Sequence, residues 1–146
     1  MTGARVGLAL LVVGWGVLTW HRAGLWTDES RLWQGATVEA PAKPRPWINL
    51  GNALPDRTAA QAAYRQAWTV AQARAQADER QLGMSLALTN HGFHALSFGD
   101  LERAHRCLSE AHTLNPRNPE IRDAWRSINQ AATAAGTLLG RSASCW

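Results

Sequence analysis

Four of the five histidines lie in the second half of the chain, at spacings that could bring imidazoles together. His91 and His94 are three residues apart in one predicted helix, and His105 and His112 are seven apart in the next. A spacing of three or four places two ligands on one helix face, as zinc requires. The helical pattern, however, turns His91 inward and His94 outward, and no cysteine or carboxylate completes a set at ligand spacing. We therefore expect no metal site and no cofactor.

The two cysteines, Cys107 and Cys145, are too few for a disulfide framework or an all-cysteine zinc site. They could pair if this part of the chain were exported, but the sequence favours two free thiols. His105 or His112 could serve Cys107 as a base. No acid that would orient the base lies at a predictable distance, however, and the sequence has no glycine-rich phosphate loop. The sequence predicts no catalytic residue and no enzymatic activity.

Length and charge set further limits. With 146 residues the chain has room for one small domain. Its net charge of +4 comes mainly from arginines, which are spread from Arg5 to Arg141 and alternate with acidic residues through the second half. That pattern is typical of solvated helix faces, so we expect no nucleic-acid partner. The many alanines favour closely packed helices over strands.

The first segment predicts a membrane anchor. From Val6 to Trp20 the chain carries 15 residues without a charge. As a helix this run covers only about 22 Å of a hydrocarbon core about 30 Å thick, but Trp20 and Trp26 extend it, because tryptophan prefers the interface. A cleaved signal peptide is the alternative, but no small-x-small cleavage site follows the run. We expect an uncleaved N-terminal transmembrane helix within residues 1–26, in contact with the membrane through residues 6–26.

Few charges orient this helix. Arg5 and the terminal amine precede the apolar run, and Arg22 and Arg31 follow it, offset by acidic residues that count little for orientation. We expect a single-pass protein with its N-terminus inside and the rest of the chain outside.

Residues 27–45 predict a linker with one short helix, about Asp28 to Gln34, and then an extended stretch, because each proline disfavours helix in the residue before it. Beyond the linker, apolar residues recur every three or four positions, and no segment longer than four residues alternates as a strand would. Residues 46–135 are therefore predicted as an all-α domain, and residues 136–146 as a flexible tail. The predicted helices are Trp47–Leu54, Thr58–Asp78, Gln81–Phe98, Leu101–Leu114 and Pro119–Ala135.

Capping residues set these boundaries. Pro46 suits the first turn of a helix, and Thr58 suits an N-cap with Gln61 three residues on. Gly99 ends one helix and Asp100 caps the next. The residues predicted to face inward are Ala60, Tyr64, Ala67 and Ala71, then Met84, Leu88, His91, Ala95 and Phe98, and finally Ala104, Leu108 and Ala111.

Two stretches of the helical domain carry the same kind of pattern. Trp47, Leu50 and Gly51 form the motif Trp-x2-Leu-Gly, with Leu54 where a tyrosine would follow. In the second stretch Gly92 is the equivalent of Gly51, and the later half of the same unit is matched by Gly99, Ala104, Leu108, Ala111 and Pro116. Together these residues resemble the tetratricopeptide repeat family. The resemblance implies two helical hairpins and a capping helix, stacked as an α-solenoid.

The match departs from the family in its spacing. Asn49 and Asn90, at equivalent positions, are 41 residues apart in place of the family's 34. Two repeats and a cap are near the lower limit for a stable array. We therefore expect the domain to pack against the linker, a neighbouring membrane protein or a second copy of the chain, which would make a homo-oligomer.

In this family the first helices of successive repeats line a concave face that binds a protein or peptide partner. The resemblance implies that asparagines on this face hydrogen-bond the ligand. The basic companions found in carboxylate-binding members are missing, so a hydrophobic helix or extended segment fits better. Two alternatives stay open: Trp125 of the last helix covers Leu86 and Phe93, or the asparagines serve internal contacts only. The residues expected to line the face are Ile48, Asn49, Asn52, Leu86, Thr89, Asn90 and Phe93.

A broader resemblance includes the linker. A hydrophobic span, Trp26, Leu32-Trp33 and a Pro-x-x-x-Arg-Pro-Trp motif ending at Trp47 are similar to the end of bacterial multi-span proteins related to protein O-mannosyltransferases. Two functions follow. The first is an adaptor in the bacterial inner membrane, with its repeat domain on the periplasmic side, that binds a protein partner and catalyses nothing. The alternative is an accessory or truncated tail of such a membrane glycosyltransferase.

Overall fold

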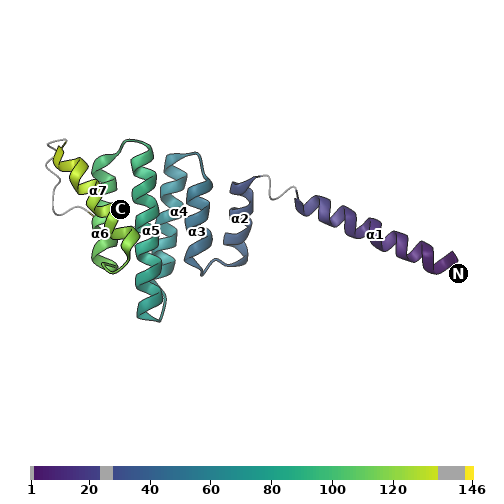
Figure 1. Cartoon of the computed structure of the whole chain (residues 1–146). Helices are drawn as coiled ribbons and strands as arrows, with labels where there is room; N and C mark the ends of the chain where they lie inside the picture. Colours follow the sequence, from purple (N-terminus) through teal and green to yellow (C-terminus); the bar gives the residue numbers. More distant parts are fainter. Residues whose placement is uncertain (1, 24–27, 135–143) are drawn as a thin grey trace.

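The computed structural model describes residues 2–23, 28–134 and 144–146 (Figure 1). Within these residues the chain forms helices and no strands, which confirms the all-α prediction. The helices are α1 (Thr2–Ala23), α2 (Glu29–Glu39), α3 (Pro44–Ala53), α4 (Arg57–Gln72), α5 (Ala77–Ser97), α6 (Leu101–Leu114) and α7 (Pro119–Ala134).

Helix α1 stands apart from the other helices (Figure 1). Its large apolar side chains are exposed, from 62% at Val13 to 85% at Trp20. By length and hydropathy taken together, none of the described helices reaches what a transmembrane helix requires, so the predicted N-terminal transmembrane span is not supported. Trp26, which the prediction placed at the membrane interface, lies outside the described residues.

The segment predicted as a linker holds helix α2. Asp28 caps it by accepting a hydrogen bond from the backbone N–H of Arg31 at 3.2 Å. The helix then runs past Gln34, where the prediction ended it, to Glu39. It packs against α3, and the ring N–H of Trp47 closes the turn between them by donating to the carbonyl of Pro41 at 3.0 Å. Packing on α3 thus favours helix where local proline signals predicted an extended chain.

The boundary between α4 and α5 also differs from the prediction. Asp56, not Thr58, caps α4, because its carboxylate accepts from the backbone N–H of Ala59 at 2.7 Å. The helix ends at Gln72, six residues before the predicted end. The next helix begins at Ala77 with Asp78 and Glu79 in its first turn, where acidic side chains stabilise the positive end of the helix dipole.

The later boundaries agree with the sequence. Helix α6 spans Leu101–Leu114 as predicted, and the Asp100 carboxylate caps it by accepting from the N–H of Arg103 at 3.1 Å. Gly99 has a φ of +73°, a conformation that few other residues adopt without strain. Asn118 caps α7 through the N–H of Glu120. Ala135, the predicted end of this helix, lies outside the described residues.

Neighbouring helices pack in chain order from α2 to α7, and α3 also packs against α5. Glycines mark the closest approaches. A Cβ on Gly51 would lie 2.5 Å from the Tyr64 ring, and one on Gly92 would lie 2.9 Å from Leu108 Cγ. The predicted inward residues are buried except for Met84, which is half-buried, and Phe98, which is 50% exposed at the end of α5.

Candidate functional site: apolar grooves and a histidine-disulfide cluster

A groove of about 440 Å³ runs between α3 and α5. Four of the seven residues predicted to line a binding face lie in its wall: Ile48 and Asn49 from α3, and Leu86 and Asn90 from α5. Leu86 is 37% exposed, so a large apolar side chain is open to a ligand here. The remaining lining residues are Pro44, Arg45, Arg74, Glu79, Leu82 and Gly83.

A second groove, of about 640 Å³, lies between α5 and α7. Phe93 belongs to this groove and is 41% exposed. Leu86, Asn90 and Phe93 are spaced by four and three residues, so the same face of α5 borders both grooves. The other lining residues are Leu96, Leu101, Glu120, Asp123, Ala124, Ser127, Ile128 and Ala131.

Two of the asparagines hydrogen-bond inside the chain. The Tyr64 hydroxyl donates to Asn52 Oδ1 at 2.8 Å, and Asn52 Nδ2 donates to Asn90 Oδ1 at 3.2 Å. Asn90 Nδ2 donates in turn to the carbonyl of Leu86 at 2.9 Å. Burial raises the pKa of Tyr64 to about 12, so its hydroxyl keeps the proton that it donates. Asn52 therefore links α3 to α4 and α5, as the alternative of internal contacts implies, while Asn90 also lies in the wall of the groove.

Two further expectations about this face are settled by geometry. Thr89 is only 5% exposed and its hydroxyl donates to the carbonyl of Ser85, so it faces into the domain and does not line the groove. Trp125 does not cover the face, because its ring stacks on His112 with the two centroids 4.5 Å apart. Among the described residues, Leu86 and Phe93 of α5 therefore stay exposed.

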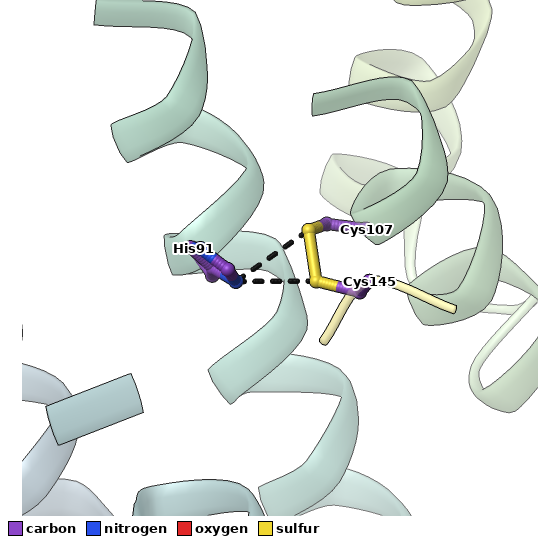
Figure 2. A group of neighbouring side chains, drawn as sticks. All are labelled: His91, Cys107 and Cys145. Atoms are coloured by element: carbon purple, nitrogen blue, oxygen red, sulfur yellow. Dashed lines mark hydrogen bonds between the residues drawn. A yellow bond between two sulfur atoms is a disulfide. The ribbon is translucent and has the colours of Figure 1, made fainter. Parts of the chain in front are cut away.

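His91 of α5 meets the two cysteines, a contact that no spacing in the sequence predicts. Cys107 of α6 and Cys145 of the C-terminal segment form a disulfide, so the prediction of two free thiols is wrong (Figure 2). His91 Nδ1 lies 3.1 Å from Cys145 Sγ and 3.5 Å from Cys107 Sγ. All three residues are buried, with exposed fractions of 3% or less.

The described end of the chain is packed, not flexible as predicted. Glu110 of α6 accepts a hydrogen bond from the backbone N–H of Cys145 at 3.2 Å. The Trp146 ring stacks on His91 at a centroid distance of 4.9 Å and lies at 6.2 Å from the ring of Trp68. On its other side His91 stacks on Tyr64 at 5.6 Å. Residues 136–143 of the predicted tail lie outside the described residues.

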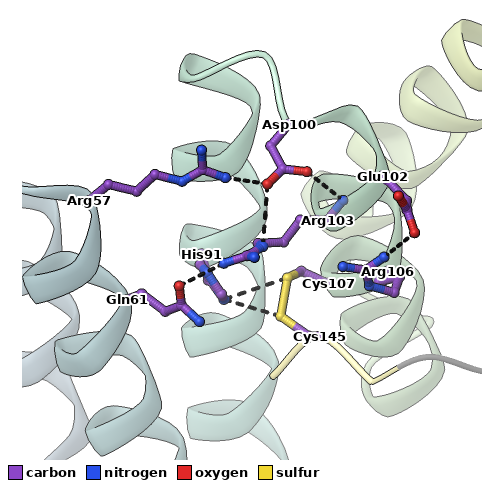
Figure 3. Close-up of polar contacts among 9 residues, drawn as sticks. All are labelled: Arg57, Gln61, His91, Asp100, Glu102, Arg103, Arg106, Cys107 and Cys145. Atoms are coloured by element: carbon purple, nitrogen blue, oxygen red, sulfur yellow. Dashed lines mark hydrogen bonds and ion pairs between the residues drawn. A yellow bond between two sulfur atoms is a disulfide. The ribbon is translucent and has the colours of Figure 1, made fainter.

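Burial and nearby positive charge keep the His91 imidazole neutral. Its pKa is lowered to about 4, first because burial removes water from the charged form and then because of the Arg103 guanidinium. Arg103 is held by the Asp100 carboxylate at 3.4 Å and by Gln61 Oε1 at 2.6 Å (Figure 3). Arg57 of α4 donates to the same carboxylate. These contacts join α4 to the start of α6 across α5.

Comparison with known proteins adds no relative. A scan against protein-family models found no match, and neither the curated proteins nor the solved structures gave one. The tetratricopeptide resemblance and the transferase resemblance therefore both stay predictions.

Proposed function

We propose that this chain is a tetratricopeptide-type adaptor that binds a hydrophobic segment of a protein partner and catalyses no reaction. The observation that carries the proposal is the pair of grooves on one face of α5, with Leu86 and Phe93 exposed between them. Exposed apolar side chains that gather in a groove, unlike ones scattered singly over a surface, are typical of a binding site. The hairpins α3–α4 and α5–α6, followed by α7, give the helix order that the repeat family would supply.

The ligand fits as an apolar segment with few charges. The groove between α3 and α5 carries Ile48, Leu82 and Leu86, and its Arg74 is paired with Glu79 at 2.9 Å. Because that ion pair is already made, the charge that the wall offers a ligand comes from Arg45, whose guanidinium would favour an acidic residue beside the apolar segment. Asn49 adds a side-chain amide to the wall, so it is placed to hydrogen-bond a ligand backbone.

We also propose that the chain is anchored in a bacterial membrane, with its repeat domain on the periplasmic side. Apolar side chains of α1 that are exposed over most of its length are stable in a lipid environment and costly in water. The Cys107–Cys145 disulfide supports an oxidising compartment, because such bonds persist in exported proteins and are rare in the cytosol.

Carbonate extraction of the full chain and of residues 28–146 tests the anchor. A full chain that washes off membranes as readily as the shorter one would refute it.

Peptide selection tests the grooves. A random peptide display library is panned on the full chain, and the enriched peptides are measured by fluorescence anisotropy against the wild type and Phe93→Glu. We expect enriched peptides rich in apolar residues, and a loss of affinity of at least about tenfold when a carboxylate replaces the ring in the groove.

Phe98→Glu is the matched control for this experiment. Phe98, at the C-terminal end of α5, is also an exposed phenylalanine. Its ring contacts His94 and lies under Arg57, outside the lining of either groove. The Phe98→Glu variant should bind the selected peptides as the wild type does, with equal helical content by circular dichroism. Equal binding by Phe93→Glu, or equal losses in the two variants, would contradict a groove at Phe93.

A further inference from the structure

The histidine-disulfide cluster holds more chemistry than a structural crosslink needs. A disulfide that only braces the fold can sit among apolar side chains, but here a buried imidazole points its Nδ1 atom at both sulfurs (Figure 2). The ligand atoms of His91, Cys107 and Cys145 all lie within 4.8 Å of one another. An imidazole nitrogen and two sulfurs are the donors that zinc prefers.

We propose that reduction of the Cys107–Cys145 bond converts this cluster into a zinc site with His91, Cys107 and Cys145 as ligands. The two states exclude each other, because the sulfur atoms are either bonded to one another or free to bind a metal as thiolates. The site is therefore gated by the redox state of the cysteine pair.

The present spacing is close to what zinc requires. Zinc bonds of about 2.0 Å to nitrogen and 2.3 Å to sulfur at a tetrahedral angle place the two ligand atoms roughly 3.5 Å apart. His91 Nδ1 already lies 3.1 Å from Cys145 Sγ and 3.5 Å from Cys107 Sγ. The imidazole already faces the space between them, held by ring stacking on Tyr64 and Trp146. Three protein ligands leave the fourth tetrahedral position to water.

The charges near the cluster are paired. Arg103 and Arg57 lie close enough to His91 for their positive charge to act on it. The Asp100 carboxylate, which pairs with both arginines, keeps that charge from being uncompensated (Figure 3). Zinc with two thiolates and a neutral imidazole carries no net charge, which lowers the cost of keeping the ion in a buried site.

The disulfide must be reduced before zinc can bind. A dithiol reductant supplies two electrons and two protons, becomes a disulfide itself, and leaves thiols at Cys107 and Cys145. Binding of Zn²⁺ then displaces the two thiol protons to solvent and forms two zinc–sulfur bonds. In the laboratory a phosphine reduces the bond with one water molecule and leaves as phosphine oxide, so no competing thiol remains.

A cobalt titration tests the proposal. The full chain is reduced with a phosphine without oxygen, desalted and titrated with Co²⁺, whose thiolate charge-transfer and tetrahedral d–d bands report the ligands. We expect one equivalent to bind with both sets of bands, zinc to displace it, and the disulfide form to bind none. His91→Asn should weaken binding by more than the roughly 10- to 100-fold that loss of even an outer-shell partner costs.

His94→Asn is the matched control, because His94 lies three residues further along α5 and its ring contacts those of Phe98 and Tyr64. It should bind cobalt as the wild type does. The fold of each variant is checked by circular dichroism in the disulfide form. Alkylation of the reduced wild type, followed by mass spectrometry, adds a test without any substitution: zinc should protect both cysteines. No stoichiometric binding by the reduced wild type, no protection, or equal affinity in His91→Asn would overturn the site.

Discussion

Gly51 is the tightest point of the packing between α3 and α4. A Cβ at this position would meet three atoms of the Tyr64 ring at 2.5 to 2.8 Å. That ring is 1% exposed and is fixed by its hydrogen bond to Asn52 and its stacking on His91, so it has little room to move. The small residue is therefore required by contact, not by backbone conformation.

We predict that Gly51→Ala lowers the free energy of unfolding by about 1 to 3 kcal/mol, as overpacking of a well-filled core does. Gly35→Ala is the control, because a Cβ on Gly35 would meet nothing within 4 Å. That change should be neutral or stabilise by up to about 1 kcal/mol through helix propensity. Urea unfolding followed by circular dichroism measures both, and equal midpoints for the two variants would contradict the packing argument.

The charge of Asp100 makes the stability of the fold depend on pH in the acid range. Burial raises the pKa of its carboxyl, but the backbone N–H of Arg103 and the charges of Arg103 and Arg57 together lower it below the usual value of 3.8. Because the folded pKa lies below the unfolded one, this carboxylate stabilises the fold above pH 3.8, and the contribution is lost as the pH falls through the folded pKa.

Comparison with Asp100→Asn tests this dependence, because asparagine keeps the N-cap of α6 but loses the charge. We predict that the wild type is more stable by about 0.5 to 1.5 kcal/mol at neutral pH, and that the difference closes as the pH falls from 3.8 through the lowered pKa of Asp100. Urea midpoints of both proteins across this range provide the measurement. A difference that stays constant with pH would show that the ion pairs contribute nothing.

At the scale of elements, the residue that caps α4 differs between the structure and the sequence prediction. The Asp56 carboxylate bonds the N–H of Ala59, whereas Thr58 lies inside the helix. We predict that Asp56→Ala costs about 1 kcal/mol of stability and that Thr58→Ala stays within about 0.5 kcal/mol. Thermal unfolding of the two variants decides between the capping residues, since a larger loss in Thr58→Ala would restore the predicted boundary.

Helices with strong local signals could be predicted from the sequence, and helices without them could not. Helix α6 lies between Gly99-Asp100 and Asn115-Pro116, and its bounds were predicted without error. The stretch from Ala71 to Ala77 holds no glycine or proline, so the end of α4 had no marker in the sequence. Helix α2 extends past the end that local sequence signals predicted, because packing against α3 favours the helix there.

The candidate sites divide in the same way. The grooves were partly predictable, because residues on a helix face follow from spacing. Ile48 and Leu86 line the groove between α3 and α5, whereas Phe93, predicted for the same face, lines the groove between α5 and α7. The histidine-disulfide cluster was not predictable, because Cys107 and Cys145 are 38 residues apart and no local pattern joins them. Spacing within one helix predicted that His91 faces inward but could not show which residues it meets.

On the scale of the whole molecule, the disulfide closes a loop of 38 residues that includes all of α7. A crosslink of this span stabilises a fold by about 4 kcal/mol in the chain-entropy model. We predict that reduction lowers the free energy of unfolding by roughly this amount when a chelator is present. Urea unfolding of oxidised and reduced protein measures it, with Cys107→Ser/Cys145→Ser as the control for the reductant. Coinciding curves for oxidised and reduced protein would contradict a stabilising role.

The position of Trp146 has a photophysical consequence. Its indole follows Cys145 directly in the chain and stacks on the His91 ring. A disulfide accepts an electron from an excited indole. The fluorescence of Trp146 should therefore be quenched while the disulfide is intact and recover once the disulfide is reduced. Subtracting the emission of Trp146→Phe isolates its signal from that of the other seven tryptophans. The chain thus carries a built-in fluorescent indicator of its own oxidation state.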